Sequence, residues 1–117
     1  MLTRHYPQKY FHRAVEAGGL LFLSGLTADD RSQDLKGQTT QVLEKLDALL
    51  KDLGSDRSKL VSATSYITSM EDKELMNEAW LEFFSAGDLP ARATIGVASL
   101  GDGILVEVVC VAEGSRK

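Results

Sequence analysis

The spacing of apolar residues predicts two amphipathic helices. Within residues 38–53, one apolar stripe follows helical spacing, and Gly54 stands where a left-handed cap would end the helix. The stripe consists of Val42, Leu46, Leu49, Leu50 and Leu53. A second helix is predicted to begin at Ser69, with Asp72 as its capping-box partner, and to end at Gly87 and Pro90. Its apolar face carries Leu75, Met76, Ala79, Trp80, Phe83 and Phe84.

Segments rich in β-formers predict five strands, at residues 12–16, 20–24, 60–68, 92–99 and 104–112. The first of these is expected at a sheet edge, because the polar residues 1–10, with Pro7, predict an irregular arm. Glycine-rich turns predict one hairpin at residues 17–19 and another at residues 101–103. The order β-β-α-β-α-β-β predicts an α+β sandwich with both helices on one face of a mixed sheet.

The last predicted strand is apolar on both faces. Ile104, Val106, Val108 and Cys110 alternate with Leu105, Val109 and Val111. A strand with one face in water would alternate apolar and polar residues instead. The second face of the sheet must therefore be covered, and we expect the chain to associate with copies of itself.

Length, composition and charge limit the classes of protein to which this chain can belong. A length of 117 residues predicts one domain, residues 1–117. No apolar run approaches the roughly 20 residues of a membrane span, and the N-terminus does not resemble a signal peptide. The net charge of −4 argues against nucleic-acid binding. The single cysteine, Cys110, cannot form an intrachain disulfide, which favours a reducing cytoplasmic location.

Two charged residues are the strongest candidates for chemistry. Glu107 interrupts the last apolar strand, where an unpaired carboxylate is costly to bury. It lies either at an edge that reaches water or at a cleft where it activates water. Arg92 opens a strand of small residues, which leaves room for its guanidinium to hold a carboxylate. The alternative for Arg92 is an arginine exposed to solvent.

The remaining candidates give weaker signals. Asn77 lies at the margin of the second helix's apolar face, and Ser24 closes a strand; each could simply be solvated. Cys110 lies in an apolar strand and is expected to be a buried, inert thiol. His5 and His12 lack the spacing of metal ligands, so no metal is expected.

Six segments, read in order, resemble the Rid family of reactive intermediate deaminases, the YjgF-type proteins. The resemblance runs from residue 11 to residue 112. Its most specific parts are the Pro90-Ala91-Arg92-Ala93-Thr94 segment and the late Val106-Glu107 pair. The other segments are Leu23-Ser24-Gly25, Gln38-Thr39, Gly54, and Asn77 followed by Trp80, Phe83 and Phe84.

This resemblance implies a fold, an assembly and a reaction. The fold would be a chorismate-mutase-like sandwich. The assembly would be a homotrimer whose sheets line a barrel-like centre, with sites in clefts between subunits. The reaction would be hydrolysis of 2-aminoacrylate and 2-imino acids, such as 2-iminopropanoate and 2-iminobutanoate, to 2-keto acids and ammonia. No metal or organic cofactor would be required.

The resemblance also implies roles for individual residues. Arg92 would hold the substrate carboxylate, and Glu107 would orient the attacking water. Ser24 and Asn77 would lie near the substrate. Phe11 stands where the family has a tyrosine, and Thr94 where it often has a cysteine, so both would line the substrate site. The missing hydroxyl at Phe11 predicts a different range of imine substrates.

Two other functions fit the same residues. The first is a trimer without enzymatic activity that binds a small carboxylate metabolite, in a regulatory or chaperone-like role. It would use Arg92 but would not need Glu107. The second is the ribonuclease activity assigned to some relatives, against which the acidic charge argues.

Overall fold

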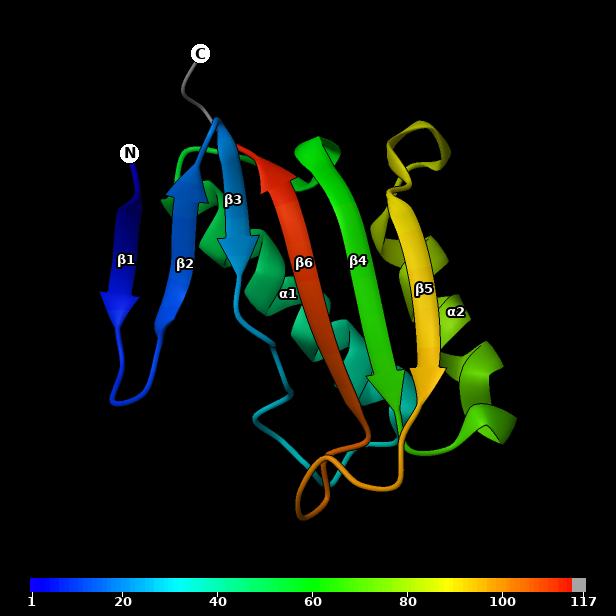
Figure 1. The fold of residues 1–117 in the computed structure, drawn as a ribbon. Helices are drawn as coiled ribbons and strands as arrows, with labels where there is room; N and C mark the ends of the chain where they lie inside the picture. The colour runs from blue at the N-terminus through cyan, green and yellow to red at the C-terminus, as the bar shows by residue number, and fades with distance from the viewer. Residues whose placement is uncertain (115–117) are drawn as a thin grey trace.

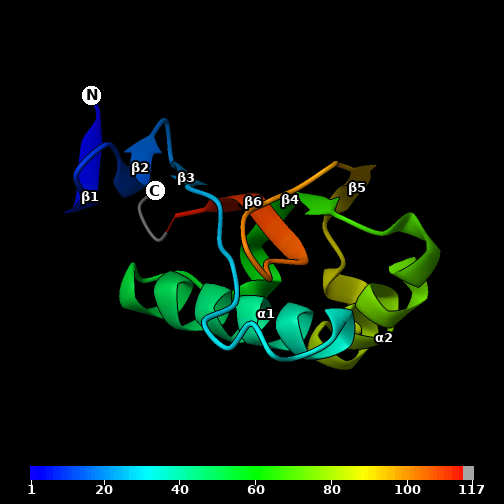
Figure 2. The same ribbon diagram turned by 90° about the horizontal axis from the view of Figure 1, so that it is seen from below.

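The computed structural model describes residues 1–114 and places two helices on one face of a six-stranded sheet (Figures 1 and 2). The elements are β1 (Thr3–Pro7), β2 (His12–Ala17), β3 (Leu20–Leu23), α1 (Leu35–Asp52), β4 (Leu60–Ile67), α2 (Lys73–Phe83), β5 (Ala91–Gly96) and β6 (Val106–Glu113). Across the sheet the strands run in the order β1-β2-β3-β6-β4-β5. The predicted α+β sandwich with a mixed sheet is confirmed.

The N-terminal segment contains a strand, so the predicted irregular arm is wrong. Strand β1 pairs antiparallel with β2, with Thr3 opposite Glu16. Strand β2 is therefore not at the edge of the sheet. The residues of β1 are largely polar and carry no alternating pattern. The strand forms because the exposed backbone of β2 offers hydrogen-bonding partners.

Of the two predicted hairpins, the first is confirmed and the second is wrong. Strands β2 and β3 are joined through Gly18 and Gly19, whose φ angles are 59° and 82°. Strand β6, however, pairs with β3 and β4, and β5 pairs in parallel with β4. The parallel β4–β5 pair needs the crossover that α2 supplies. The apolar strand β6 takes the centre of the sheet, where both of its neighbours shield it from water.

Helix α1 starts earlier than predicted because Asp34 caps it. The Asp34 carboxylate accepts a hydrogen bond from the Gly37 N–H at 2.9 Å, which satisfies a backbone donor of the first turn. At the other end, Gly54 has a φ of 80°, and the Ser55 N–H donates to the Leu50 carbonyl at 2.8 Å. The predicted left-handed cap at Gly54 is therefore confirmed.

Helix α2 begins at Lys73, after a single 3-10 turn at Met70–Asp72. Ser69 makes no side-chain hydrogen bond to the turn, so the predicted capping box with Asp72 is wrong. The apolar face of the helix is buried as predicted, through Met76, Ala79 and Trp80.

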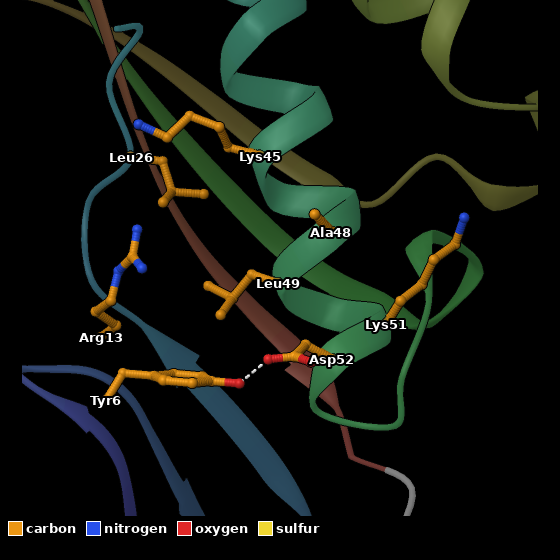
Figure 3. A pocket seen from close by; sticks show the side chains of 8 residues that line it. All are labelled: Tyr6, Arg13, Leu26, Lys45, Ala48, Leu49, Lys51 and Asp52. Atoms are coloured by element: carbon orange, nitrogen blue, oxygen red, sulfur yellow. Dashed lines mark hydrogen bonds between the residues drawn. The ribbon is translucent and has the colours of Figure 1, made fainter.

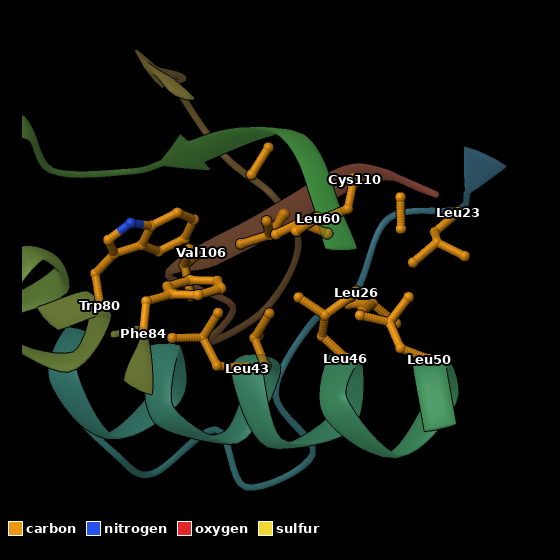
Figure 4. Close-up of a cluster of buried hydrophobic side chains, with 14 of the residues drawn as sticks. Leu23, Leu26, Leu43, Leu46, Leu50, Leu60, Trp80, Phe84, Val106 and Cys110 are labelled. Carbon is orange, nitrogen blue, oxygen red and sulfur yellow. The ribbon is translucent and has the colours of Figure 1, made fainter. Parts of the chain in front are cut away.

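One hydrophobic core fills the space between the helices and the sheet (Figure 4). The side chains of Leu43, Leu46 and Leu50 project from α1 towards the sheet and are fully buried. They meet the inward-facing residues of β6 and β4, which include Leu60, Val106 and Cys110. Truncating any one of these leucines to alanine would lower the free energy of unfolding by about 2–5 kcal/mol. Packing of these side chains therefore stabilises the contact between α1 and the sheet.

The buried Gln38 amide links three segments near one end of the molecule. Its Nε2 donates to the carbonyls of Gln33 at 3.1 Å and of Gly103 at 2.9 Å. Its Oε1 accepts from the Leu105 N–H at 3.0 Å. One side chain of α1 therefore fixes the loop before the helix and the loop that leads into β6.

The sheet face opposite the helices carries exposed apolar residues. Phe22 on β3, Ile95 on β5 and Val109 on β6 are 46%, 43% and 37% exposed. Neither helix covers this face (Figure 2). In residues 1–114, no helix is both long and apolar enough to cross a membrane.

Candidate functional site

Arg92 lies on strand β5 and faces helix α2. It pairs in register with Ala63, and Thr94 pairs with Ser65. Both partners on β4 are buried against the helices, and paired residues share a sheet face. The guanidinium carbon lies 5.2 Å from the centroid of the Trp80 ring. This cation–π contact orients the Arg92 side chain between β5 and α2.

A hollow of about 330 Å³ surrounds the Arg92 side chain. We call it the Arg92 hollow; it is lined by Glu74, Asn77, Trp80, Leu81, Leu89, Pro90 and Arg92. The Asn77 Nδ2 donates to the Glu74 carboxylate at 3.1 Å. Within residues 1–114, the buried Asn77 Oδ1 and Thr94 Oγ1 have no hydrogen-bond partner. Buried polar atoms of this kind are usually satisfied, so these two oxygens are exceptions beside the Arg92 side chain, although Thr94 itself does not line the hollow.

Glu107 lies on the opposite face of the sheet. Its neighbours Val106 and Val108 are buried against the helices, and side chains alternate along a strand. The Glu107 carboxylate packs against Gly25, just beyond β3. A Cβ atom at Gly25 would lie 2.8 Å from the Glu107 carboxyl carbon, which is closer than real contacts allow. Glycine at this position therefore lets the carboxylate approach the end of β3.

Ser24 and Phe11 share a second hollow of about 370 Å³. We call it the Ser24 hollow; it is lined by Gln8, Phe11, Arg13, Ser24, Gly25, Leu26, Thr27 and Lys45. The Ser24 hydroxyl donates to the His12 carbonyl at 2.7 Å, so its oxygen can still accept a hydrogen bond. The Phe11 side chain is 52% exposed. Because Gly25 lines this hollow, the Glu107 carboxylate adjoins it.

The candidate residues therefore form two groups within one chain. Arg92, Asn77 and Thr94 lie between β5 and α2, whereas Phe11, Ser24 and Glu107 lie near the end of β3. Strands β5 and β6 are separated by β4, which puts them two strand spacings, about 10 Å, apart. Arg92 and Glu107 also point to opposite faces. One small substrate cannot touch both residues of the same chain.

Cys110 cannot act as a nucleophile in this fold. It is buried on β6, and burial raises the pKa of its thiol to about 12. The thiol is therefore protonated at neutral pH, and the predicted inert cysteine is confirmed. The His5 Nε2 lies 3.5 Å from the Glu16 carboxylate. Among residues 1–114, no group of three or more His, Cys, Asp or Glu side chains could hold a metal ion.

Three polar residues near the N-terminal strands were not singled out in the sequence. The Tyr6 hydroxyl donates to the carboxylate of Asp52, which lies 46 residues further along the chain. Arg13 lines the Ser24 hollow from β2. No local pattern signals either feature, because both depend on where β1 and β2 lie relative to the end of α1.

Comparison with known proteins gives consistent matches over most of the chain. The family model described as Endoribonuclease L-PSP matches residues 2–114. A RutC family protein from Haemophilus ducreyi is 32% identical over 112 residues, which are 96% of each chain. Reactive Intermediate Deaminase A from Arabidopsis thaliana is 33% identical, over 87% of this chain and 57% of the relative. The crystal structure of a YjgF family member from Neisseria meningitidis superimposes with a TM-score of 0.93 at 29% identity, covering 100% of this chain and 98% of that one.

Proposed function

We propose that this chain, which belongs to the Rid family of Endoribonuclease L-PSP and YjgF-type proteins, is a hydrolytic deaminase of 2-imino acids. The relative named Reactive Intermediate Deaminase A supports a deaminase role in general. The main support for the proposal is the position of the Arg92 guanidinium. It lies over the Trp80 ring, near the buried side-chain oxygens of Asn77 and Thr94, which have no hydrogen-bond partner within residues 1–114. Its expected substrates are 2-iminopropanoate, 2-iminobutanoate and the enamine tautomer 2-aminoacrylate.

The complete site is proposed to form between two copies of the chain. Arg92 of one copy would face Phe11, Ser24 and Glu107 of the next. A homotrimer with a barrel-like centre would also cover the apolar sheet face that carries Phe22 and Val109. The split of the candidate residues into two distant groups supports this arrangement. The assembly is proposed to work in the cytoplasm, with residues 1–117 acting as one domain.

The proposed reaction needs one cation and one carboxylate. Arg92 holds the substrate carboxylate through two parallel hydrogen bonds and fixes the neighbouring C2 atom in space. Glu107 accepts a proton from a water molecule while the water oxygen bonds to C2 and the C=N π electrons move to nitrogen. Glu107 returns this proton to the nitrogen, which gives a neutral carbinolamine. Glu107 then takes the hydroxyl proton and passes it to the amino group, so that ammonia leaves with the C–N bonding electrons, a 2-keto acid remains and Glu107 is again a carboxylate.

The other candidate residues would shape the site. Asn77 and Thr94 lie on the Arg92 side, where Asn77 lines the hollow and Thr94 lies two residues along β5 from Arg92. Ser24 can accept a hydrogen bond from the imine N–H or the water. Phe11 offers an apolar surface without a hydroxyl, which favours imino acids with apolar side chains.

A second candidate function is binding of a small carboxylate metabolite without turnover. The isolation of the Arg92 hollow from Glu107 favours this alternative, because a carboxylate could bind there without any catalytic group. Ribonuclease activity has less support, since the net charge is −4 and phosphate backbones require a cationic surface.

A coupled assay tests the proposed function. An amino-acid oxidase generates 2-imino acids in place, and semicarbazide traps those that persist. We expect the protein to lower the yield of semicarbazone and to accelerate release of ammonia. Heat-denatured protein serves as the control. Equal semicarbazone yields with and without native protein, across several side chains, would rule out the deaminase.

Gly25→Ala should damage catalysis while leaving the fold intact. The added Cβ overlaps the end of the Glu107 side chain, which can rotate away at little cost in stability. A shift of about 1 Å in a catalytic group can lower turnover roughly 100-fold. Gly87→Ala is the matched control, because its Cβ would meet nothing within 4 Å. Steady-state kinetics and thermal melting measure both effects, and full activity in Gly25→Ala would contradict the role of Glu107.

A further inference from the structure

A hollow of about 610 Å³ lies between α1 and the strands β1 and β2 (Figure 3). We call it the Tyr6 hollow; it is lined by Tyr6, Arg13, Leu26, Lys45, Ala48, Leu49, Lys51 and Asp52. It adjoins the Ser24 hollow, since Arg13, Leu26 and Lys45 line both. None of the proposed deaminase residues lines the Tyr6 hollow, although its Arg13 side chain also borders the Ser24 hollow.

Tyr6 forms one wall of this hollow in a strained conformation. Its φ of 56° lies in the left-handed region, which bulky side chains rarely adopt. Strain of this kind persists where surrounding contacts hold it, and it clusters at ligand sites. The Tyr6 hydroxyl donates to the Asp52 carboxylate, and this hydrogen bond raises the pKa of the phenol. The ring is therefore fixed across the end of the hollow, and Asp52 already has a donor.

Two of the cations in the wall are already paired. The Lys45 ammonium lies 3.0 Å from the Asp29 carboxylate and also donates to the Thr27 carbonyl at 2.8 Å. The Lys51 ammonium lies 3.1 Å from the Asp47 carboxylate. Neither lysine therefore needs a ligand to balance its charge.

Arg13 differs from these lysines. Within residues 1–114 its side chain makes no ion pair and no hydrogen bond. Figure 3 shows the guanidinium directed towards Leu26 and away from the Tyr6–Asp52 hydrogen bond. The surface beside it is apolar, formed by Leu26, Ala48 and Leu49. The wall thus offers one unpaired planar cation next to a hydrocarbon surface.

We propose that the Tyr6 hollow binds a small carboxylate with a short aliphatic tail. The Arg13 guanidinium pairs with the carboxylate through its planar fork, and the tail lies on Leu26, Ala48 and Leu49. The Tyr6 ring closes the end of the hollow and limits the length of the tail. The ligand is a monoanion, because Asp52 on the wall disfavours a second negative charge and Asp29 already pairs with the ammonium of Lys45.

NMR titration with sodium hexanoate tests this site. The parent protein carries Arg92→Ala, so that the carboxylate site of the proposed deaminase does not contribute and the outcome is independent of that function. We expect saturable shifts of the Arg13 side-chain N–H and of the Leu26 and Leu49 methyl groups. Adding Arg13→Gln should weaken binding by about tenfold or more. Adding Arg4→Gln is the matched control and should leave the affinity unchanged, because Arg4 is exposed on β1 and does not line the hollow.

Two further measurements test separately how the shape of the hollow and the charge of the ligand contribute to binding. Ala48 is exposed on α1, so Ala48→Phe should leave the helix intact while its ring fills the hollow and abolishes binding. Hexanol, which has the same tail without the charge, should bind at least about tenfold more weakly than hexanoate. Equal affinity of Arg13→Gln and its parent for hexanoate would overturn the proposal. So would hexanoate shifts confined to residues outside the Tyr6 hollow.

Discussion

Arg92→Ala is expected to lower kcat/KM for 2-imino acids by roughly 100- to 1000-fold. Each hydrogen bond between the guanidinium and the substrate carboxylate is charge-assisted, and the alanine variant loses both together. The alanine variant therefore lacks the group that positions C2 for attack, and it also binds the substrate more weakly. The coupled oxidase assay measures the effect, and titration with 2-oxobutanoate, the keto-acid product, reports the loss of binding directly.

The stability of the Arg92 variant should change little. The side chain is exposed and its described contact is with the Trp80 ring, which contributes about 0.5–1 kcal/mol at such a site. Arg92→Lys is the matched control, since it keeps the charge but loses the planar fork, and its activity should fall between those of the wild type and Arg92→Ala. Turnover at the wild-type rate in a folded Arg92→Ala protein would refute the assigned role.

Glu107→Gln is expected to lower kcat by roughly 100- to 10,000-fold while product binding changes little. Glutamine has nearly the same shape as glutamate, so it can still pack against Gly25, but it cannot accept a proton from water. Arg92 is unaffected and continues to hold the carboxylate of 2-oxobutanoate. Single-turnover kinetics and a product titration together separate the two effects.

A second carboxylate on the same strand provides the control. Glu113 shares the sheet face of Glu107 but lies at the far end of β6, so Glu113→Gln should leave kcat unchanged. If Glu107→Gln retained the wild-type kcat, the Glu107 carboxylate could not be the group that accepts the proton from water. If neither the wild type nor Glu107→Gln turns over any imino acid, yet both bind 2-oxobutanoate equally well, the chain is a metabolite-binding protein.

The helices and most strands could be predicted because their signals are local. The leucine stripe of α1 and the glycine that ends it are properties of adjacent residues, and both are confirmed. Strand β1 could not be predicted in this way. It contains mainly polar residues and forms by pairing with β2. The central place of β6 was also missed, because a glycine-rich turn indicates a reversal of the chain but not which strands become neighbours.

The sequence singles out the residues of the proposed site, which stay a prediction, but it does not indicate how those residues are arranged. Arg92 and Glu107 stand out because each interrupts a segment of small or apolar residues. Their orientation depends on the register of β5 and β6 against β4, which places them on opposite faces. Tyr6 and Asp52 gave no signal at all, since their contact joins residues 46 positions apart.

The Gln38 amide restricts which changes of loop length relatives of this chain can accept. It bonds the loop before α1 and the loop before β6, and its contact with Leu105 lies two residues from Glu107. An insertion or deletion in either loop would break or distort the hydrogen bonds of the Gln38 amide and displace the start of β6. The two loops should therefore change length together, or only after Gln38 has been replaced. Most surface loops vary freely during evolution, so a paired constraint here would preserve the position of Glu107 across lineages whose other loops differ.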